Sequence, residues 1–378
     1  MDVHAEPLET LRLRTSEKWT MYPPEVLPLF VAEMDYPLAP AIIEALVERV
    51  RASDTGYVGH AGPLAPAFAG FAARRWGWDV APESIRTTTD VSVAIVETLR
   101  MAIEPGDEVV ITPPVYPPFF DLPVEAGGVV VEVPLLSTGD GWSLDLDGLE
   151  RAFAAGARAL LLCNPHNPLG LVHSRAVLEH VASLAARYGV TVVSDEIHGA
   201  LVADTAAFTP FLTVSDDARE HGVVVTSASK AFNLAGLKCA VMVAASDRSR
   251  ALLDGMPEEV GFRTSILGLH ASVAAFTDGD EWLDGAVRSI GENGMLLGTL
   301  LDEHLPGIRY RAPAASYLAW LDFRALDWGA DPSIRALAAG VALNAGPTFG
   351  TLGAGHARLN LACSPEVLTE AVRRLASA

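Results

Sequence analysis

Between about residues 80 and 245 the chain alternates short, wholly apolar segments with segments of helical spacing. VLEHVASLAARYGV, at 177–190, repeats its apolar residues at the intervals of an amphipathic helix. Apolar strands separated by helices predict a mainly parallel sheet with helices on both faces. The expected strands lie within 107–114, 127–135, 157–165, 191–196, 223–230 and 239–246.

The length of 378 residues predicts more than one domain, since domains usually hold about 100–200 residues. Residues 1–40 are rich in proline and aromatic residues and predict an irregular arm. A large domain is expected over 41–270, beginning with a helix at 41–50. The remainder, 271–378, combines long helical stretches with two strand-like segments and predicts a smaller α+β domain against which the arm packs.

The chain is strongly acidic, with 27 Lys and Arg against 47 Asp and Glu, a net charge of −20. This argues against nucleic acid and anionic membranes as partners, although one anionic cofactor could still bind in a local positive pocket. Three widely spaced cysteines favour buried core residues over disulfides or a metal site. The N-terminus has no apolar leader and no segment is long enough to span a membrane, so a cytoplasmic protein is expected.

Several chemically capable side chains follow the predicted strands, where ligands of parallel sheets bind. Lys230 comes directly after an apolar strand and could form an imine with an aldehyde cofactor if its pKa is lowered. Ser227 and Ser229 could hold a phosphate. Asp195, after the preceding strand, could keep a pyridine nitrogen protonated. Alone, each residue has an ordinary explanation, such as a surface lysine or a strand-end ion pair.

Three further candidates occupy other loops after strands. Asn167 lies in the proline-rich turn 164–170, and an asparagine there could tune a phenolate oxygen or serve only the turn. Tyr116 could stack on a flat ring or cap the core. His198 could contact a cofactor or be an ordinary polar residue at a strand exit. Their conjunction with a lysine and an aspartate favours one shared site.

These segments, taken in chain order, resemble fold-type I pyridoxal 5′-phosphate (PLP) enzymes of the class I and II aminotransferase superfamily, and most of all the cystathionine β-lyase, or C–S lyase, subgroup. The resemblance covers essentially the whole chain. It implies a large domain with a mainly parallel seven-stranded sheet and a smaller α+β domain. It rests on KWTMYPPEVLPLFVAEMDYPLAP (18–40), GYVGH (56–60), PPVYPPF (113–119), NPHNPLG (164–170), SDEIHGAL (194–201), SASKAFNLAGL (227–237), GDEWLD (279–284) and ARLNLACSP (357–365).

The resemblance implies roles around the cofactor ring. Lys230 would carry PLP as a Schiff base and act as general acid and base. Asp195 would pair with the pyridine nitrogen, and Asn167 would donate to the phenolate oxygen. Tyr116 would stack on the ring and assist catalysis, and His198 would be a further cofactor contact.

The resemblance also implies phosphate and substrate contacts. Ser227, Lys238 and the backbone N–H groups of Val91 and Ser92 would hold the phosphate. Tyr57 would reach the phosphate of a neighbouring subunit, which implies a homodimer with shared active sites. Arg358 would clamp the substrate carboxylate, with Asn167 and Tyr57 beside the substrate.

The chain departs from the family pattern at five positions. Phe30 and Glu33 stand where the N-terminal signature usually has Trp and Asp. Asp90 stands near a position that usually holds glycine in the phosphate-binding turn, and a carboxylate there is unfavourable unless it turns away. Lys238 replaces a common arginine. His198 replaces a tyrosine found in many aminotransferases, which favours the lyase subgroup.

The expected function is therefore PLP-dependent α,β-elimination of L-cystathionine or related cysteine S-conjugates, giving a thiol, pyruvate and ammonia. A PLP-dependent aminotransferase of a small amino acid is the alternative, because no motif separates the two chemistries. A regulatory PLP-binding protein is a further alternative, although the acidic chain disfavours DNA binding. A Rossmann dehydrogenase is disfavoured because GTLGAG (350–355) lacks the required spacing, and no metal-ligand pattern is present.

Overall fold

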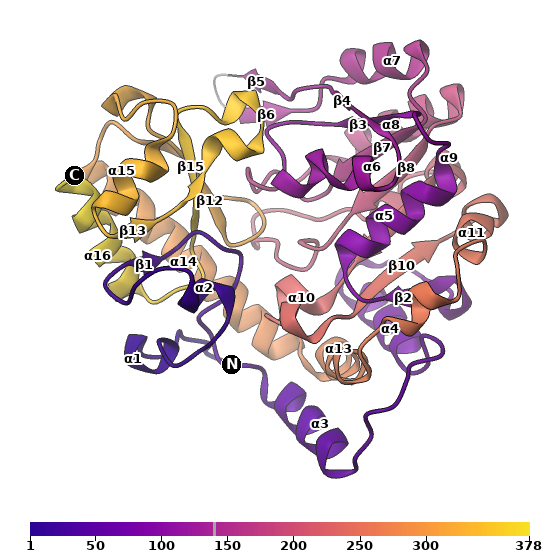
Figure 1. The fold of residues 1–378 in the computed structure, drawn as a ribbon, viewed down its shortest axis with the longest axis horizontal. Helices are drawn as coiled ribbons and strands as arrows, with labels where there is room; N and C mark the ends of the chain where they lie inside the picture. Colours follow the sequence, from indigo (N-terminus) through magenta and orange to yellow (C-terminus); the bar gives the residue numbers. More distant parts are fainter. Residues whose placement is uncertain (139–140) are drawn as a thin grey trace.

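The computed structural model describes residues 1–138 and 141–378. Its centre is a seven-stranded sheet in the order β2-β10-β9-β8-β7-β3-β4 (Figure 1). Every pairing is parallel except those of β10, which runs antiparallel to β2 and β9. This confirms the predicted sheet. The strands are β2 Ile85–Thr88, β3 Glu108–Ile111, β4 Val129–Glu132, β7 Ala159–Cys163, β8 Thr191–Asp195, β9 Gly222–Thr226 and β10 Ala240–Ala244.

Both faces of this sheet are covered because alternate residues of its apolar strands point to opposite sides. Val109 and Ile111 pack on one face with α5, while Val110 packs on the other face with α8. The core residues therefore divide into two layers, one on each side of the sheet. The first face carries α5 Val91–Ala102, α6 Leu122–Glu125 and α11 Asp247–Asp254, and the second carries α4 Leu64–Trp76, α7 Leu146–Ala155, α8 Arg175–Tyr188 and α13 Ile266–Asp278.

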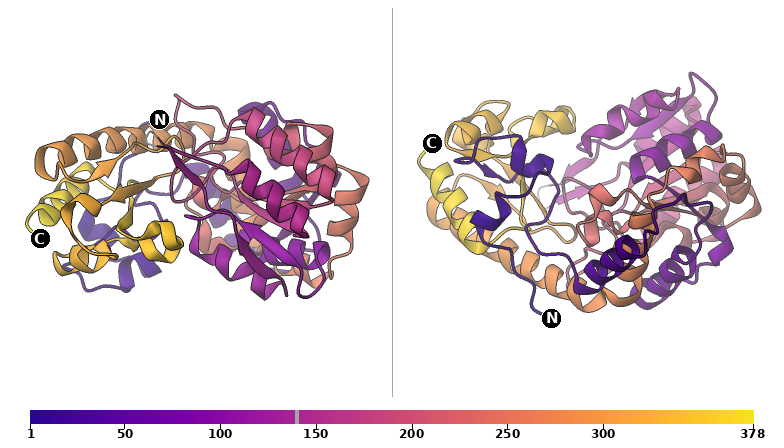
Figure 2. Two further views of the ribbon diagram at one scale, coloured as in Figure 1. Left: turned by 90° about the horizontal axis from the view of Figure 1, so that it is seen from above. Right: turned by 60° about the horizontal axis from the view of Figure 1, so that its bottom comes forward.

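A second, smaller unit is built on a four-stranded antiparallel sheet, β11-β12-β15-β14. The 25-residue helix α14, Asp280–His304, runs from the large unit along this sheet (Figure 2). The expected domain division at 270/271 falls inside α13, a helix packed against α3 and α4. The bounds are β11 Arg309–Tyr310, β12 Leu318–Asp322, β14 Asn344–Ala345, β15 His356–Asn360, α15 Pro332–Ala338 and α16 Pro365–Ala376.

The N-terminal arm crosses from the small unit to the large one. Its β1, Leu27–Pro28, pairs in parallel with β13, Val341–Ala342. Lys18 and Asp35 form an ion pair of 2.6 Å, and both side chains are almost wholly buried. The arm is thus a packed part of the fold, although its regular structure is limited to β1 and two short helices, α1, Leu8–Leu11, and α2, Glu17–Thr20.

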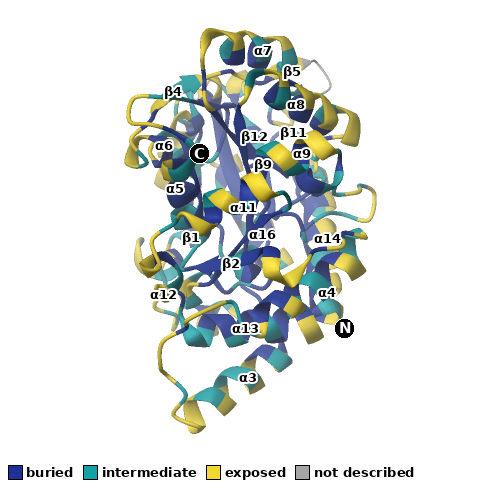
Figure 3. Cartoon of the chain, turned by 90° about the vertical axis from the view of Figure 1, so that its right-hand side faces the viewer, coloured by how far each residue is buried: buried dark blue, intermediate teal, exposed yellow. Residues whose placement is uncertain are grey.

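Helix α3, Pro40–Arg51, stands at the edge of the molecule and is only partly covered (Figure 3). Ile43, Val47 and Val50 on this helix are exposed. Among the described residues no helix is both long and apolar enough to cross a membrane. The remaining elements are α9 Asp216–His221, α10 Ala228–Ala231, α12 Glu259–Phe262 and the hairpin of β5 Leu136–Thr138 with β6 Gly141–Ser143.

Candidate active site

Lys230 lies in the one-turn helix α10, immediately beyond the carboxyl end of β9. Ser227 begins this helix and its hydroxyl accepts the N–H of Ser229 at 3.1 Å. Lys230 Nζ donates to the carbonyl of Ala32 in the arm, at 3.1 Å. Burial, with a contribution from the charge of Arg358, lowers the pKa of Lys230 to about 8. About a tenth of the amine is therefore unprotonated and nucleophilic at pH 7, far more than for an ordinary lysine.

Asp195 is the last residue of β8 and is buried. Its Oδ1 accepts the N–H of Ile197 at 3.1 Å, the only hydrogen bond to this carboxylate among the described residues. Burial raises the pKa of Asp195 to about 7, while the Ile197 N–H and the charge of Lys230 oppose that rise. A cation placed against this carboxylate would restore its charge.

Asn167 and Arg358 meet at a buried contact between the large and small units. Arg358, on β15, donates through Nη1 to Asn167 Oδ1 at 3.0 Å. The side-chain oxygen of Asn167 is therefore used, and its Nδ2 remains a donor for another acceptor. A phenolate oxygen is such an acceptor, so this bond orients Asn167 as the predicted role requires.

Arg358 is a buried guanidinium without an anionic partner among the described residues. Its Nη2 donates to the carbonyl of Phe30 at 3.1 Å, its Nε has no hydrogen-bond partner, and the group lies over the ring of Phe349. Burial lowers the pKa of Arg358 to about 10, so it stays protonated at neutral pH. Burying an unpaired charge is costly. A carboxylate that binds beside Arg358 would offset this cost, so the buried guanidinium is the arrangement expected of a carboxylate-binding site.

Two aromatic side chains lie near these groups. Tyr116 follows β3 on a short turn and is half-buried, and its raised pKa, caused mainly by burial and then by Asp195, keeps the phenol neutral. His198 is buried with its ring edge toward Tyr317, and its Nδ1 has no hydrogen-bond partner within the described part of the chain. Burial and the charges of Lys230 and Arg358 lower the pKa of His198 to about 3, so the imidazole is neutral.

The arm contributes backbone groups that the sequence did not identify as part of the site. The carbonyl of Ala32 accepts from both Lys230 and the hydroxyl of Tyr317, the latter at 2.9 Å. Asn360 Nδ2 donates to the carbonyls of Val31 and Glu33. On the arm side these contacts run through main-chain carbonyls, which the residue types do not reveal. The side chains that reach them include Tyr317 and Asn360, and Asn360 falls within the segment ARLNLACSP (357–365).

The predicted phosphate-binding residues gather at the start of α5. Val91 and Ser92 are its first residues, and the first N–H groups of a helix have no partner within it. Asp90 caps this helix and pairs with Lys238 at 3.1 Å, so its carboxylate is engaged rather than simply turned away. The Ser227 hydroxyl donates to the carbonyl of Cys239 at 2.6 Å, and it would have to exchange that bond to serve a phosphate.

Tyr57 is not brought into this cluster. It lies in the connection between α3 and α4, and the residue is 92% exposed. Its predicted action on a neighbouring subunit stays a prediction. The three cysteines are free and buried, as predicted, and no group of residues suited to a metal ion occurs in the described part of the chain.

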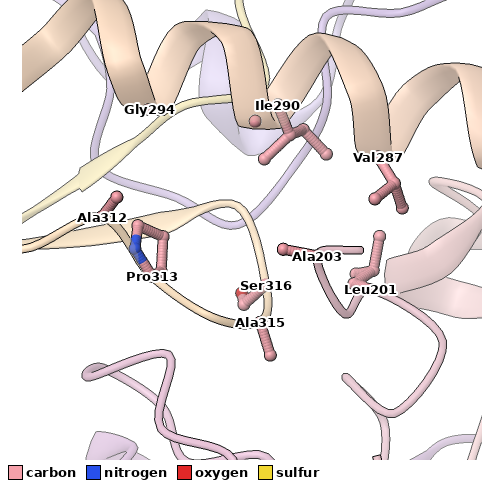
Figure 4. A pocket seen from close by; sticks show the side chains of 10 residues that line it. Leu201, Ala203, Val287, Ile290, Gly294, Ala312, Pro313, Ala315 and Ser316 are labelled. Atoms are coloured by element: carbon pink, nitrogen blue, oxygen red, sulfur yellow. The ribbon is translucent and has the colours of Figure 1, made fainter. Parts of the chain in front are cut away.

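An apolar pocket lies apart from this cluster, between α14 and two loops (Figure 4). Leu201 and Ala203 come from the loop after β8, and Pro313 and Ser316 come from the segment before β12. None of the predicted site residues lines it. The described residues that line it include no charged side chain, so the pocket lacks a cation that would pair with an amino-acid carboxylate.

The described groups suit pyridoxal phosphate. An amine of lowered pKa, a buried carboxylate with a single hydrogen bond and an amide donor lie at the ends of adjacent strands. In the predicted roles they would face the aldehyde, the pyridine nitrogen and the phenolate oxygen of that cofactor. The start of α5 would offer N–H groups to its phosphate.

Fold and site together define an α/β protein built to hold a flat anionic cofactor on a lysine. Residues 24–375 match the family described as aminotransferase class I and II, and the chain belongs to this family. The match confirms the predicted superfamily and its fold-type I architecture.

Relatives point to one subgroup within the family. Cystathionine beta-lyase of Corynebacterium glutamicum is 37% identical, over 98% of this chain and 98% of its own length. Cystathionine beta-lyase PatB of Bacillus subtilis is 36% identical, over 94% and 92%. Cystalysin of Treponema denticola, whose crystal structure contains pyridoxal 5′-phosphate, is 27% identical with a TM-score of 0.91, over 97% of this chain and 96% of that one.

Proposed function

We propose that this protein is a PLP-dependent carbon–sulfur β-lyase that acts on L-cystathionine or related cysteine S-conjugates. The observation that carries the proposal is the buried, unpaired Arg358 held beside Lys230 and Asn167. This arrangement receives an α-amino acid by its carboxylate next to a nucleophilic amine. Full-length similarity to cystathionine beta-lyases supports the sulfur-containing substrate class.

Lys230 is the group that moves protons in this proposal. When bound, PLP supplies an aldehyde carbon for an imine with an amine and a ring that accepts the electrons released at Cα. Lys230 Nζ takes the Cα proton as general base. Asp195 holds the positive charge of the ring nitrogen, and this role is supported by its burial, which raises its pKa and favours pairing with a cation.

The remaining residues position the substrate. Arg358 binds the α-carboxylate bidentately, and Asn167 links that guanidinium to the cofactor side of the site. The C–S bond at Cβ then breaks and the sulfur leaves as a thiol after protonation, with Lys230 or water as the proton source. Overall, L-cystathionine and water give homocysteine, pyruvate and ammonia.

The proposal includes assembly and location. We infer a homodimer in which Tyr57 of each subunit serves the phosphate of the other, supported by the exposed tyrosine and by the uncovered apolar face of α3. A cytoplasmic location is also proposed, supported by the three cysteines, which are buried as free thiols.

The first test is the visible absorbance of the purified protein with PLP, compared with Lys230→Ala. The wild type should show the absorbance of a lysine-bound cofactor, and Lys230→Ala should lose it. Wild type alone should then release pyruvate and free thiol from L-cystathionine. Conversion of a keto acid to an amino acid in place of pyruvate release would establish the aminotransferase alternative.

A further inference from the structure

The fold brings Asp90 and Lys238 together at the edge of the sheet that carries the site. β2 and β10 are antiparallel neighbours, with Thr88 opposite Ala240. Asp90 lies two residues beyond Thr88, and Lys238 lies two residues before Ala240. Lys238 Nζ is 3.1 Å from Asp90 Oδ2. The pair therefore closes the end of these two strands beside the start of α5.

Asp90 also acts on the helix itself. Its Oδ1 accepts the N–H of Val93 at 3.0 Å, and this caps α5. The N–H groups of Val91 and Ser92 are left for an external anion. A phosphate bound there would thus lie next to a carboxylate, which the fold keeps in place through both a cap and an ion pair.

Both members of the pair lie close enough to affect the active-site groups. Burial is the main cause of the raised pKa of Tyr116, and the charge of Asp90 contributes to it. Burial is also the main cause of the lowered pKa of Lys230, and the charge of Lys238 contributes to it. The negative charge of Asp90 and the positive charge of Lys238 therefore have opposite effects on a ligand bound at this end of the site.

We propose that Asp90 opposes and Lys238 supports binding of the cofactor phosphate, so that the summed charge of this pair sets the affinity for PLP. The proposal rests on the placement of PLP in the proposed function. A phosphate carries close to two negative charges, so a neighbouring carboxylate repels it and an ammonium attracts it. With Asp90 present, the helix start supplies most of the net attraction. The chain should hold its cofactor more weakly than one with a neutral residue at this position.

The test is the dissociation constant of the apoprotein for PLP, measured by absorbance titration for four proteins. Asp90→Asn keeps the cap, because asparagine caps helices as well as aspartate does. It should bind PLP about tenfold more tightly, and Lys238→Ala about tenfold more weakly. The double variant Asp90→Asn/Lys238→Ala restores the net charge of the pair and should bind like wild type.

Pyridoxal, which lacks the phosphate, is the matched control ligand. Its capture by Lys230 should vary far less among the four proteins than the binding of PLP does. Weaker PLP binding by Asp90→Asn would overturn the proposal and make Asp90 a positioning residue for Lys238. Equal effects on PLP and pyridoxal would also overturn it, since the pair would then act on the fold. A wild type that binds no PLP would contradict the proposed function itself, and the proposal with it.

Discussion

The lowered pKa of Lys230 is the residue-level property on which the chemistry depends. An ordinary lysine has a pKa near 10.5, and burial together with Arg358 brings that of Lys230 to about 8. The unprotonated amine captures aldehydes, so its fraction rises with pH and is nearly complete about one unit above the pKa. A site lysine of this kind reacts under conditions in which surface lysines stay protonated.

We therefore predict that the rate of PLP capture by the apoprotein rises with pH and levels off above about pH 9. Stopped-flow absorbance between pH 6 and 10.5 measures this rate, with Lys230→Ala as the blank. A rate that is still rising steeply above pH 10 would show that the pKa of Lys230 is not lowered.

The guanidinium of Arg358 gives a second prediction at this scale. Arg358→Lys keeps the charge but loses the planar fork that binds a carboxylate and Asn167. The variant should lose about 10- to 100-fold in kcat/KM for L-cystathionine, mostly through KM. Arg86→Lys is the matched control, because Arg86 pairs with Asp254 at the surface. A loss confined to kcat would contradict the carboxylate-binding role.

Glu196, next to Asp195, is buried and its carboxyl group accepts hydrogen bonds from neighbouring loops and strands. Its Oε1 accepts from Phe211 N–H and from the side chains of Ser194 and Asn164, while Oε2 finds no hydrogen-bond partner among residues 1–138 and 141–378. Burial raises its pKa from 4.5 to about 8. The folded state thus favours the protonated acid, and the stability this gives is lost as pH rises from about 4.5 through about 8.

Glu196→Gln should remove this pH-dependent loss, since an amide keeps Oε1 as an acceptor and carries no charge. The variant should melt about 2–4 °C above wild type at pH 8.5 and show no advantage at pH 5. Thermal unfolding of the apoproteins at both pH values measures this. An equal gain at both would rule out titration of Glu196 as the cause.

At the scale of elements, one buried ion pair joins two parts of the arm on either side of the segment that reaches the site. Lys18 and Asp35 lie 2.6 Å apart with side chains 0% and 2% exposed. Removing one partner of such a pair leaves the other buried and unpaired, at a cost of about 3–5 kcal/mol. Between these two residues the arm supplies the carbonyl of Ala32 to Lys230.

Asp35→Ala should therefore lower the free energy of unfolding by about 3 kcal/mol or more. Denaturant unfolding measures it, and Asp254→Ala, which breaks the exposed pair with Arg86, should cost less than about 1 kcal/mol. Similar losses in the two variants would contradict the structural role of the buried pair.

The large sheet could be predicted from the sequence because its strands are continuous apolar runs, and the residues after them could be assigned to one site because parallel strands end at a common edge. Asp195, Asn167 and Lys230 were found in this way. The contacts of the arm could not be predicted, because Ala32 acts through its carbonyl. The Asp90–Lys238 pair could not be predicted either, because it depends on the antiparallel pairing of β2 with β10. The resemblance to the family indicated only that an aspartate at position 90 is unusual.

At the scale of the whole molecule, the exposed Tyr57 and the uncovered face of α3 fit a shared dimer site. If Tyr57 serves the other subunit, mixing inactive Lys230→Ala with Tyr57→Ala subunits should create one intact site per mixed dimer. Random mixing makes about half of the dimers mixed, so activity should recover to about a quarter of wild type. Unfolding and refolding the two variants together, followed by assay, measures it. No recovery above the separate variants would contradict shared sites.

The balance of products from L-cystathionine tests the proposed lyase activity most directly. Purified protein with PLP and no keto acid is given L-cystathionine, and pyruvate, homocysteine and ammonia are counted over many turnovers. A β-lyase releases the three in equal amounts, and Lys230→Ala releases none. Turnover that requires an added keto acid, or that stops after one equivalent of substrate, would contradict the lyase assignment and identify an aminotransferase.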